Sequence, residues 1–322
     1  MKITKILVSF LALGLVFAQD RPVSTYSIVA IDKESGEMGG AVQSHWFSVG
    51  SLVLWAEPGV GIVATQSFVR PEYGPELLKL FATSSASPKF VLRSLLKKDS
   101  EQNVRQIGAV NIEGESVSFT GKDCVSYASS IEGDGYAIQA NIMASPGVPE
   151  AMEKAYLSTK GSLADRLYAA LVAAENLGGD LRGKQSAAML VVPLKEVDNL
   201  LSSKIYDIRV DDSPNPLEDL GRLMRIQKAY IFANEGDILS AEGRLDEALD
   251  AYNQASELYP ENVELLFWGA VILCTDGKFD IAKPMFEKIF QTSPELRKMI
   301  PRLENHPMFP LKSDTVQKIL AL

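Results

Sequence analysis

Histidine and cysteine are scarce in this sequence of 322 residues. The only histidines are His45 and His306, which excludes a histidine-rich zinc site and leaves a serine–histidine–aspartate triad with one plausible base. The only cysteines, Cys124 and Cys274, fall in different parts of the chain, so we expect no disulfide framework. We also expect no metal and no cofactor.

Positive charge and long apolar runs are also limited. Lysine and arginine together number 32 against 41 aspartates and glutamates, which gives a formal net charge of −9. An acidic chain without a basic patch is a poor candidate for binding nucleic acid or an anionic membrane surface. Beyond the N-terminal segment, no stretch reaches the roughly 20 apolar residues of a membrane span. We therefore expect neither a nucleic-acid partner nor a span in the mature chain.

The N-terminal segment, residues 1–18, has the pattern of a secretory signal peptide. Lys2 and Lys5 form a basic region, an apolar region follows, and Val16-Phe17-Ala18 places small residues where a signal peptidase cleaves. The alternative is a membrane anchor, but the apolar region is too short to span a bilayer. We predict cleavage after Ala18 and a secreted or periplasmic protein.

Near the C-terminus, one pattern occurs twice at a spacing of 34 residues. The segment 243–260 reads GRLDEALDAYNQASELYP, and the segment 277–294 reads GKFDIAKPMFEKIFQTSP. The matched glycine, aspartate, alanine, aromatic and proline positions resemble tetratricopeptide (TPR) repeats. We expect preceding helices at Ala229–Glu242 and Val263–Asp276, a separate helix that begins at Asn215-Pro216, and a cap formed by Glu295–Leu322.

Residues 215–322 are thus predicted to form a TPR-like helical domain. Such repeats usually hold a peptide or a partner protein in a concave groove. The alternative is that two repeats only extend or dimerise the preceding domain. Because two repeats are fewer than a free-standing array needs, we expect them to pack on that domain.

Residues 24–214 are predicted to form an α+β domain. Alternating apolar positions and turn residues indicate strands at Thr25–Asp32, Gly39–Ser44, Phe47–Trp55, Gly59–Gln66, Val104–Asn111, Ser116–Phe119, Tyr136–Met143, Ser186–Val192 and Lys204–Val210. Two helices are expected between the fourth and fifth strands, and two more before Ser186; the last carries a capping box of Ser162 and Asp165. Hairpins that alternate with helix pairs predict a four-layer αββα sandwich.

Several segments of this domain resemble the family catalogued as domain of unknown function 1028. The motifs are TYSIVAIDKESGEMGGAVQSHWFSVG, GVGIVATQSFVRPEYG, RQIGAVN, YAIQANIMASP, GGDLRGKQSAAMLVV and YDIRVDDSPNP. They cover about Thr25 to Pro216. That family resembles the N-terminal nucleophile hydrolases, the sandwich fold of proteasome subunits and their relatives, and its own activity is unassigned.

The resemblance implies a chemistry that needs no histidine. In these hydrolases, the first strand begins with a threonine, serine or cysteine, which attacks an amide while its own α-amine takes the proton. Thr25 occupies that position, and the backbone near Ala64–Thr65 corresponds to the strand that stabilises the oxyanion. Ser44 and His45, at the end of the second strand, are further catalytic candidates.

Two features of the sequence depart from that pattern. Signal cleavage after Ala18 leaves Gln19–Ser24 in front of Thr25, so a second cut between Ser24 and Thr25 is required to free its amine. Proteasome-type sites also use a lysine to lower the pKa of the nucleophile, and no lysine occurs between Lys33 and Lys79. The alternative interpretation is that Thr25 is a β-branched residue that opens a strand.

Other polar residues are predicted to gather at one end of the sandwich, where they would form a pocket for an amide-bearing ligand. Gln139 and Asn141 share one face of their strand, because side chains alternate along a strand. The candidate ligand-binding residues are Gln43, Gln66, Gln139, Asn141, Asp180, Arg182, Gln185 and Ser186. The alternative is structural: buried amides satisfy one another, and Asp180 and Arg182 form an exposed ion pair.

Two hypotheses for function therefore remain open. The first is an exported amidohydrolase that acts on a peptide, an amino sugar or a cell-wall fragment, with repeats that bind a partner. The second is a non-catalytic binding domain on the same sandwich. A mature N-terminus at Thr25 favours the enzyme, and one at Gln19 favours the binding domain.

Overall fold

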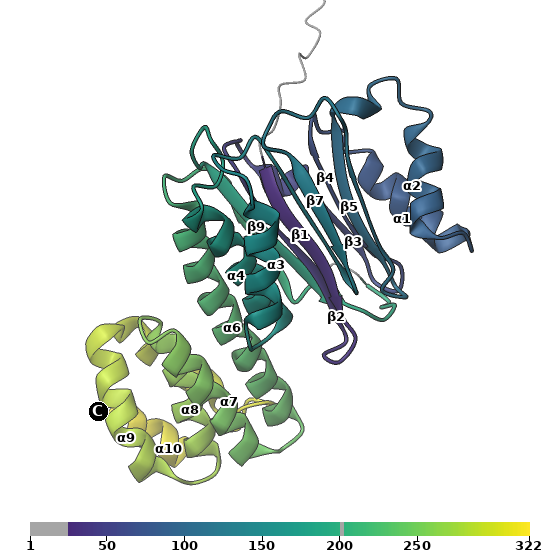
Figure 1. Ribbon diagram of the computed structural model, residues 1–322. Helices are drawn as coiled ribbons and strands as arrows, with labels where there is room; N and C mark the ends of the chain where they lie inside the picture. The colour runs from purple at the N-terminus through teal and green to yellow at the C-terminus, as the bar shows by residue number, and fades with distance from the viewer. Residues whose placement is uncertain (1–24, 200–202) are drawn as a thin grey trace, which may run out of the picture.

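The structure is a computed structural model that describes residues 25–199 and 203–322. The predicted signal peptide and the segment Gln19–Ser24 lie outside the described residues. Two antiparallel sheets stack face to face, with helices on both outer sides (Figure 1). The predicted αββα sandwich is confirmed, and helical repeats follow it.

The larger sheet has the order β10-β9-β2-β1-β8-β7 within the described part of the chain. Its strands are β1 (Thr25–Asp32), β2 (Glu37–Ser44), β7 (Ser129–Gly133), β8 (Tyr136–Asn141), β9 (Ser186–Pro193) and β10 (Tyr206–Val210). β1 and β2 are joined by a tight turn in which the Asp32 carboxylate accepts the amides of Glu34 and Ser35 and Gly36 has a φ of +70°. This turn fixes the register that pairs Thr25 with Ser44.

The smaller sheet has the order β3-β4-β5-β6, again counted over the described residues. Its strands are β3 (Leu54–Glu57), β4 (Gly61–Ser67), β5 (Arg105–Asn111) and β6 (Ser116–Thr120). Side chains from the two inner faces, such as Val29, Val42, Ile62 and Val110, form the buried core between the sheets.

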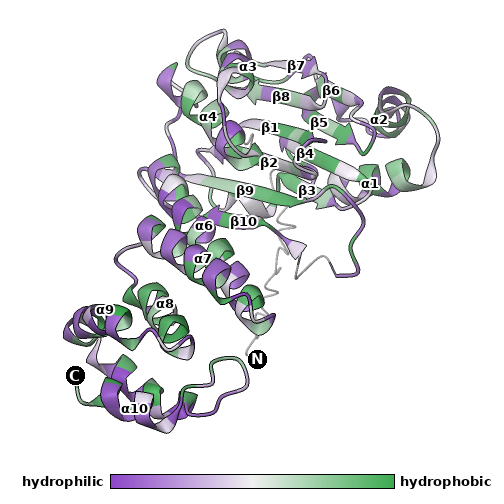
Figure 2. Ribbon diagram, turned by 90° about the horizontal axis from the view of Figure 1, so that it is seen from below, coloured by the Kyte–Doolittle hydropathy of each residue, from purple (hydrophilic) through white to green (hydrophobic). Residues whose placement is uncertain are grey.

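Helices cover the outer face of each sheet. α1 (Tyr73–Thr83) and α2 (Pro88–Leu96) pack on the smaller sheet, and α3 (Val148–Ser158) and α4 (Leu163–Asn176) pack on the larger one (Figure 1). The predicted capping box of α4 is confirmed: the Ser162 hydroxyl accepts the Asp165 amide, and the Asp165 carboxylate accepts the Ser162 amide. The central strands are largely coloured as hydrophobic in Figure 2, whereas the helices that cover them alternate between hydrophobic and hydrophilic residues.

The repeats have the predicted pattern. They comprise α7 (Leu245–Leu258), α8 (Val263–Thr275), α9 (Phe279–Thr292), a 3₁₀ segment (Pro294–Leu303) and α10 (Ser313–Leu320). Gly243 and Gly277 both have a φ of +76° in the turns, which an L side chain rarely adopts. The matched alanines and aromatics of the two repeats are all fully buried: Ala248, Ala282, Tyr252 and Phe286. The 3₁₀ segment and α10 cover the end of this core, as expected of a cap.

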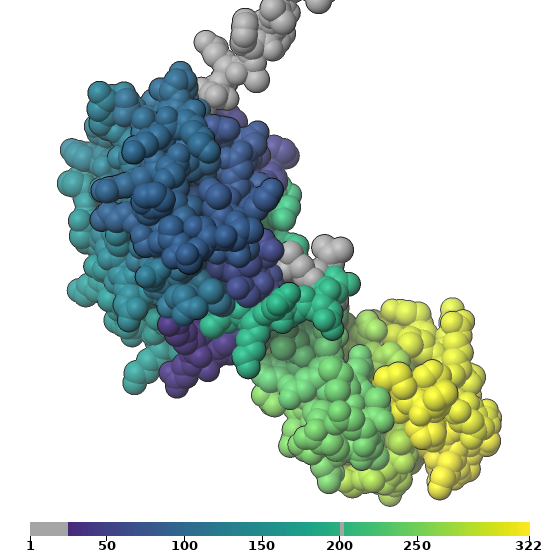
Figure 3. Space-filling view, turned by 90° about the vertical axis from the view of Figure 1, so that its right-hand side faces the viewer, coloured from purple at the N-terminus to yellow at the C-terminus, as the bar shows by residue number. Residues whose placement is uncertain are grey.

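The linker helix was predicted incorrectly. Instead of two helices, α6 runs without a break from Pro216 to Ala241. Leu220 and Met224 pack on the sandwich, whereas Ala229 and Ala233 pack on the repeats, so one helix belongs to both cores. The two lobes are visible in Figure 3, and α6 connects them in Figure 1.

Two strands also differ from the prediction. The expected strand Phe47–Trp55 is reduced to β3, because the chain before it turns at Ser48 and enters a short 3₁₀ turn. There the Val49 amide donates to the Ser186 hydroxyl instead of to a sheet neighbour. β7 has only one large apolar residue, Ile131, and for that reason was not predicted.

In the described residues, no helix combines the length and the apolar character that a bilayer span requires.

Candidate functional site

A row of polar residues crosses the larger sheet at the end where β1 begins. Ser186, Ser44, Thr25 and Asn141 lie directly opposite one another on β9, β2, β1 and β8. Directly paired residues point to the same face of a sheet, and here that face is the interior of the sandwich. All are fully buried, and the Thr25 hydroxyl donates to Ser44 Oγ at 3.1 Å. The structure thus brings together two of the three predicted catalytic residues.

The backbone carbonyl of Thr25 is held by two amide side chains. Gln66 Nε2, from the opposite sheet, donates to this oxygen at 3.0 Å, and Asn141 Nδ2 approaches it at 3.3 Å. Both nitrogens also donate to Gln106 Oε1, at 2.8 and 2.9 Å. The start of β1 is therefore fixed from both sheets.

Gln106 is the centre of a buried group that we call the amide cluster, which consists of Ser27, Gln66, Gln106, Gln139 and Asn141. Its Nε2 donates to Thr120 Oγ1 and to the Ala140 carbonyl, both at 2.9 Å. One step further into the sandwich, Gln139 Nε2 donates to Ser27 Oγ at 2.8 Å, and Ser27 Oγ donates to Gln66 Oε1 at 2.6 Å. Mutual hydrogen bonding of this kind favours the structural interpretation of Gln66, Gln139 and Asn141.

Two acceptors of the cluster have no hydrogen-bond partner among the described residues, Gln139 Oε1 and Asn141 Oδ1. Gly108 makes room for the first, since a Cβ at this position would lie 1.8 Å from Gln139 Oε1. The cluster is thus closely packed, and its remaining hydrogen-bonding capacity consists of acceptors.

Strained backbone gathers at the same end of the sandwich. Ser67 is the last residue of β4, and Ser48 and Ile142 follow β2 and β8; the φ angles of Ser48, Ser67 and Ile142 are 53°, 69° and 56°. A positive φ is unusual for any residue with a side chain and is a clear outlier for a β-branched one such as Ile142. Residues held in this way cost about 1–3 kcal/mol each and concentrate at functional sites.

A buried ion pair braces the segment that follows Ser67. Arg105 Nη1 donates to the Phe68 carbonyl at 2.7 Å, and Arg105 Nε contacts the Asp99 carboxylate at 2.9 Å. Burial alone raises the pKa of Asp99, but hydrogen bonds from Arg105, the Glu101 amide and Tyr73 outweigh it, so the pKa is lowered overall. The negative charge of Asp99 is therefore part of the folded structure.

The loop before β9 is organised by Asp180. Its buried carboxylate accepts the His45 amide at 2.9 Å and contacts Arg182 through the backbone amide, Nε and Nη2. Asp180 therefore connects this loop to the chain that follows β2. The His45 ring makes no hydrogen bond to a described residue, and Gly183 lies beside it.

The remaining predicted ligand residues lie apart from the row. Gln43 faces the helices, where Gln43 Nε2 and Tyr26 Oη both donate to Glu175 Oε2 at 2.8 Å. Burial, followed by the charge of Glu175, raises the pKa of Tyr26 well above its usual value. Gln185 donates to Asp212 at the surface at 3.0 Å. No hydrogen bond between described residues joins Gln139 or Asn141 to Arg182, so the predicted residues form separate groups.

The expected oxyanion donor is also engaged elsewhere. The Thr65 amide donates to the Val53 carbonyl at 3.1 Å, because β4 is an inner strand with neighbours on both sides. The proposal that the Ala64–Thr65 backbone binds an oxyanion is therefore wrong for the Thr65 amide in this structure.

Sequence reasoning missed Ser27, Gln106 and Glu175. The signal for Gln106 is present, because in RQIGAVN it shares its alternation phase with Gly108 and Val110, which face the other sheet. A long polar side chain at an inward position of a buried strand needs a buried partner.

Known protein families match the sandwich and the repeats separately. A model of the family of unknown function DUF1028 matches residues 25–220, and a TPR repeat model matches residues 236–275. A crystal structure of a DUF1028 protein from Silicibacter pomeroyi is 29% identical, covers 62% of this chain and 88% of its own, and superposes with a TM-score of 0.55. No curated protein matches. The TPR match points to protein partners, and the chain as a whole belongs to the DUF1028 family, with a TPR repeat after its sandwich domain.

Proposed function

We propose that the sandwich domain is an amide hydrolase with Thr25 as its nucleophile. The observation that carries the proposal is the placement of Thr25. It is the first residue of β1, its hydroxyl faces the interior in hydrogen-bond contact with Ser44, and two amides fix its carbonyl. The strained residues at the same end of the sandwich support a functional site there.

The chemistry requires a free α-amine on Thr25. After the Ser24–Thr25 bond is hydrolysed, this amine would take the proton from Oγ1 as Oγ1 attacks the carbonyl carbon of an amide. The amine then returns the proton to the leaving nitrogen, the carbon–nitrogen bond breaks, and an ester to Thr25 remains. A water molecule, deprotonated by the same amine, hydrolyses the ester and restores the threonine.

Ser44 would act as a positioning residue, because its Oγ accepts the Thr25 hydroxyl and so selects one rotamer of the nucleophile. Thr25 is fully buried in the uncut chain, so we expect the uncut protein to be inactive. The substrate classes that suit this chemistry are peptides, amino sugars carrying an amide, and cell-wall fragments.

We further propose that the protein is exported, into the periplasm or the medium, on the basis of the signal-like residues 1–18. An exported hydrolase whose repeats bind a protein partner would act where that partner places it.

The test determines the N-terminal residue of the mature protein and then measures its covalent labelling. Exported protein is analysed by mass spectrometry and then treated with a β-lactone, whose strained ester ring acylates a nucleophilic N-terminal threonine. We expect a mature chain that begins with Thr25 and carries one acyl group there. Thr25→Ser should retain labelling, Thr25→Ala should abolish it, and Thr83→Ala, at an exposed position of α1, should leave it unchanged.

A mature chain that begins at Gln19 and resists labelling would instead support a non-catalytic binding domain. The closed amide cluster is the observation that favours that second function, since it leaves few polar groups free for catalysis.

A further inference from the structure

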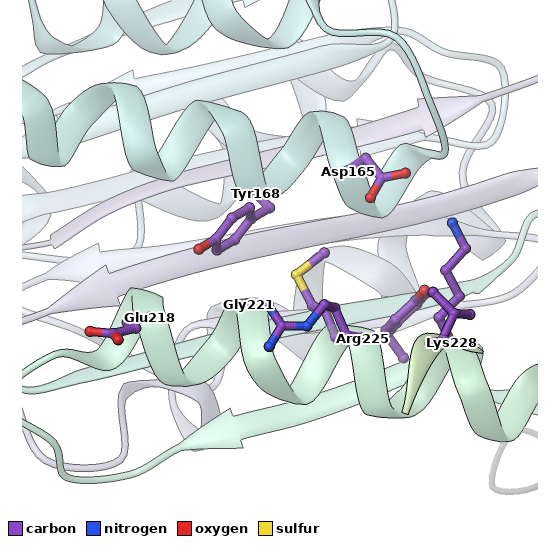
Figure 4. A pocket seen from close by; sticks show the side chains of 9 residues that line it. Asp165, Tyr168, Glu218, Gly221, Arg225 and Lys228 are labelled. Carbon is purple, nitrogen blue, oxygen red and sulfur yellow. The ribbon is translucent and has the colours of Figure 1, made fainter. Parts of the chain in front are cut away.

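The hollow between the sandwich and α6 does not select a ligand by charge. It has a volume of about 390 Å³ and brings Asp165 and Glu218 together with Arg225 and Lys228 (Figure 4). Because carboxylates and cations line it in equal number, neither an anion nor a cation is favoured there. A surface that reveals the chemistry of its ligand lies instead in the repeats.

Helix α8 is apolar on all sides, so each of its sides needs a cover. Its sequence is VELLFWGAVILCT, and buried residues occur around its whole circumference. Its neighbours α7 and α9 pack against two of these sides. The side that carries Trp268 is covered by Phe309, from the chain before α10, at a distance of 4.9 Å between the ring centroids.

The segment that carries Phe309 touches both helices that precede the repeated segments, α6 and α8. We call residues 305–310 the cap loop. Phe309 is 6% exposed and packs on Trp268 of α8, while Ser240 Oγ of α6 donates to the Met308 carbonyl at 3.4 Å. The cap loop therefore occupies the surface that α6 and α8 share.

The two ends of the cap loop are joined independently of its tip. The Leu311 amide donates to the Leu303 carbonyl at 3.2 Å, and the Asn305 amide donates to the Leu311 carbonyl at 3.0 Å. Both leucines are buried, and Asn305 reverses the chain with a φ of 55°. The tip can thus move away from α6 and α8 while this base, and the cap that it belongs to, stays in place.

The tip of the cap loop has the features of a bound peptide. Prolines at 307 and 310 favour extended conformations of His306 and Phe309, which precede them. Pro307 and Pro310 are exposed, as is the Met308 side chain. The tip contacts the helices through an aromatic ring and a backbone carbonyl, and any peptide with an aromatic side chain can supply both.

We propose that the cap loop is an internal ligand of the repeats, which a partner protein displaces with an extended segment that carries an aromatic residue followed by proline. The chain's own Phe309-Pro310 shows which chemistry α6 and α8 accept. The partner's ring takes the place of Phe309 against Trp268, and one of its backbone carbonyls accepts the Ser240 hydroxyl. This device is independent of the proposed hydrolase, because it uses residues of the repeats alone.

The tethered loop lowers the affinity of a free peptide. A peptide binds only while the tip is open, so its apparent affinity falls in proportion to the open fraction. Removing the ring of Phe309 opens the surface and leaves room for the ring of a peptide. The closed loop therefore predicts that a variant without this ring binds such a peptide more tightly than the native chain does.

The experiment measures peptide binding to the full chain by fluorescence anisotropy. The probe is a fluorescein-labelled peptide of sequence HPMFPL, and its counterpart carries alanine in place of phenylalanine. We expect Phe309→Ala to bind the phenylalanine peptide at least tenfold more tightly than the native chain, and to bind the alanine peptide at least tenfold more weakly than the phenylalanine peptide.

A second variant keeps the ring and loosens only the loop. Pro307→Gly/Pro310→Gly replaces two exposed prolines, which raises the entropy of the open loop, and should strengthen peptide binding about threefold. The matched control is Pro260→Gly/Pro294→Gly, which replaces two exposed prolines at the ends of α7 and α9 and should change affinity less than twofold.

Circular dichroism of each variant verifies that the helices remain folded. Equal binding of the phenylalanine peptide by the native chain and Phe309→Ala, no binding by either, or equal binding of both peptides by Phe309→Ala would overturn the proposal. If Phe309→Ala unfolds the repeats, the proline variants decide: equal affinities of the loop variant and its control would show that the cap loop is only a part of the core.

Discussion

Replacing Gln106 with leucine should destabilise the sandwich more than any exposed substitution. The Gln106 amide makes five hydrogen bonds, to Gln66, Asn141, Thr120, Ala140 and, at 3.3 Å, to Ser129. Leucine has a similar volume, so the change removes polar contacts without opening a large cavity. Gln106→Leu therefore isolates the contribution of the hydrogen bonds.

The expected loss of stability can be estimated from the groups that keep or lose a hydrogen-bond partner. Gln66 Nε2 and Asn141 Nδ2 retain the Thr25 carbonyl, whereas Thr120 and the carbonyls of Ala140 and Ser129 lose a donor. A lost buried hydrogen bond costs about 1 kcal/mol net, and an unsatisfied buried group costs about 1–3 kcal/mol. We expect the free energy of unfolding to fall by about 3–4 kcal/mol.

Urea unfolding measures this value. Tryptophans occur at positions 46, 55 and 268, so a Trp268→Phe background makes fluorescence report on the sandwich alone. The control is Gln185→Leu, which removes one surface hydrogen bond, to Asp212, and should cost less than about 1 kcal/mol. A loss below about 1 kcal/mol for Gln106→Leu would show that the amide cluster does not hold the sheets together.

Three further predictions concern other parts of the chain. Ala248→Asp buries an unpaired carboxylate in the repeats and should lower their free energy of unfolding by several kcal/mol, while the sandwich keeps its own unfolding transition. A single shared transition would mean that α6 couples the unfolding of the two lobes completely. Folding lowers the pKa of Asp99, so the contribution of Asp99 to stability should be complete above the unfolded pKa of about 4 and should decline as the pH falls below that value. Asp99→Asn should abolish this pH dependence, and an unchanged acid melting curve for the variant would contradict the prediction. Gly108→Ala should displace the Gln139 side chain and lower the melting temperature, and an unchanged melting temperature would show that the cluster adapts.

The repeats could be predicted in detail because their contacts are local. A TPR helix packs mainly on its neighbours in the chain, so glycine in the turn, alanine at the close contact and the aromatic recur at a fixed spacing that can be seen in the sequence. The same local rules predicted the capping box of α4. They failed at α6, because whether two helical segments join depends on the two cores between which they lie.

Some features of the candidate site could likewise be predicted from local sequence patterns, and others could not. Alternation along single strands predicted that Gln139 and Asn141 share one face and that Thr25 opens a strand. The resemblance of the motifs to a family with a sandwich fold was a separate observation from the sequence. Which residue lies opposite which depends on strand pairing over more than 100 positions, as between Thr25 and Asn141. Only the tertiary structure placed Ser44, Thr25, Asn141 and Ser186 in one row, because sheet register and stacking are set by contacts distant in sequence.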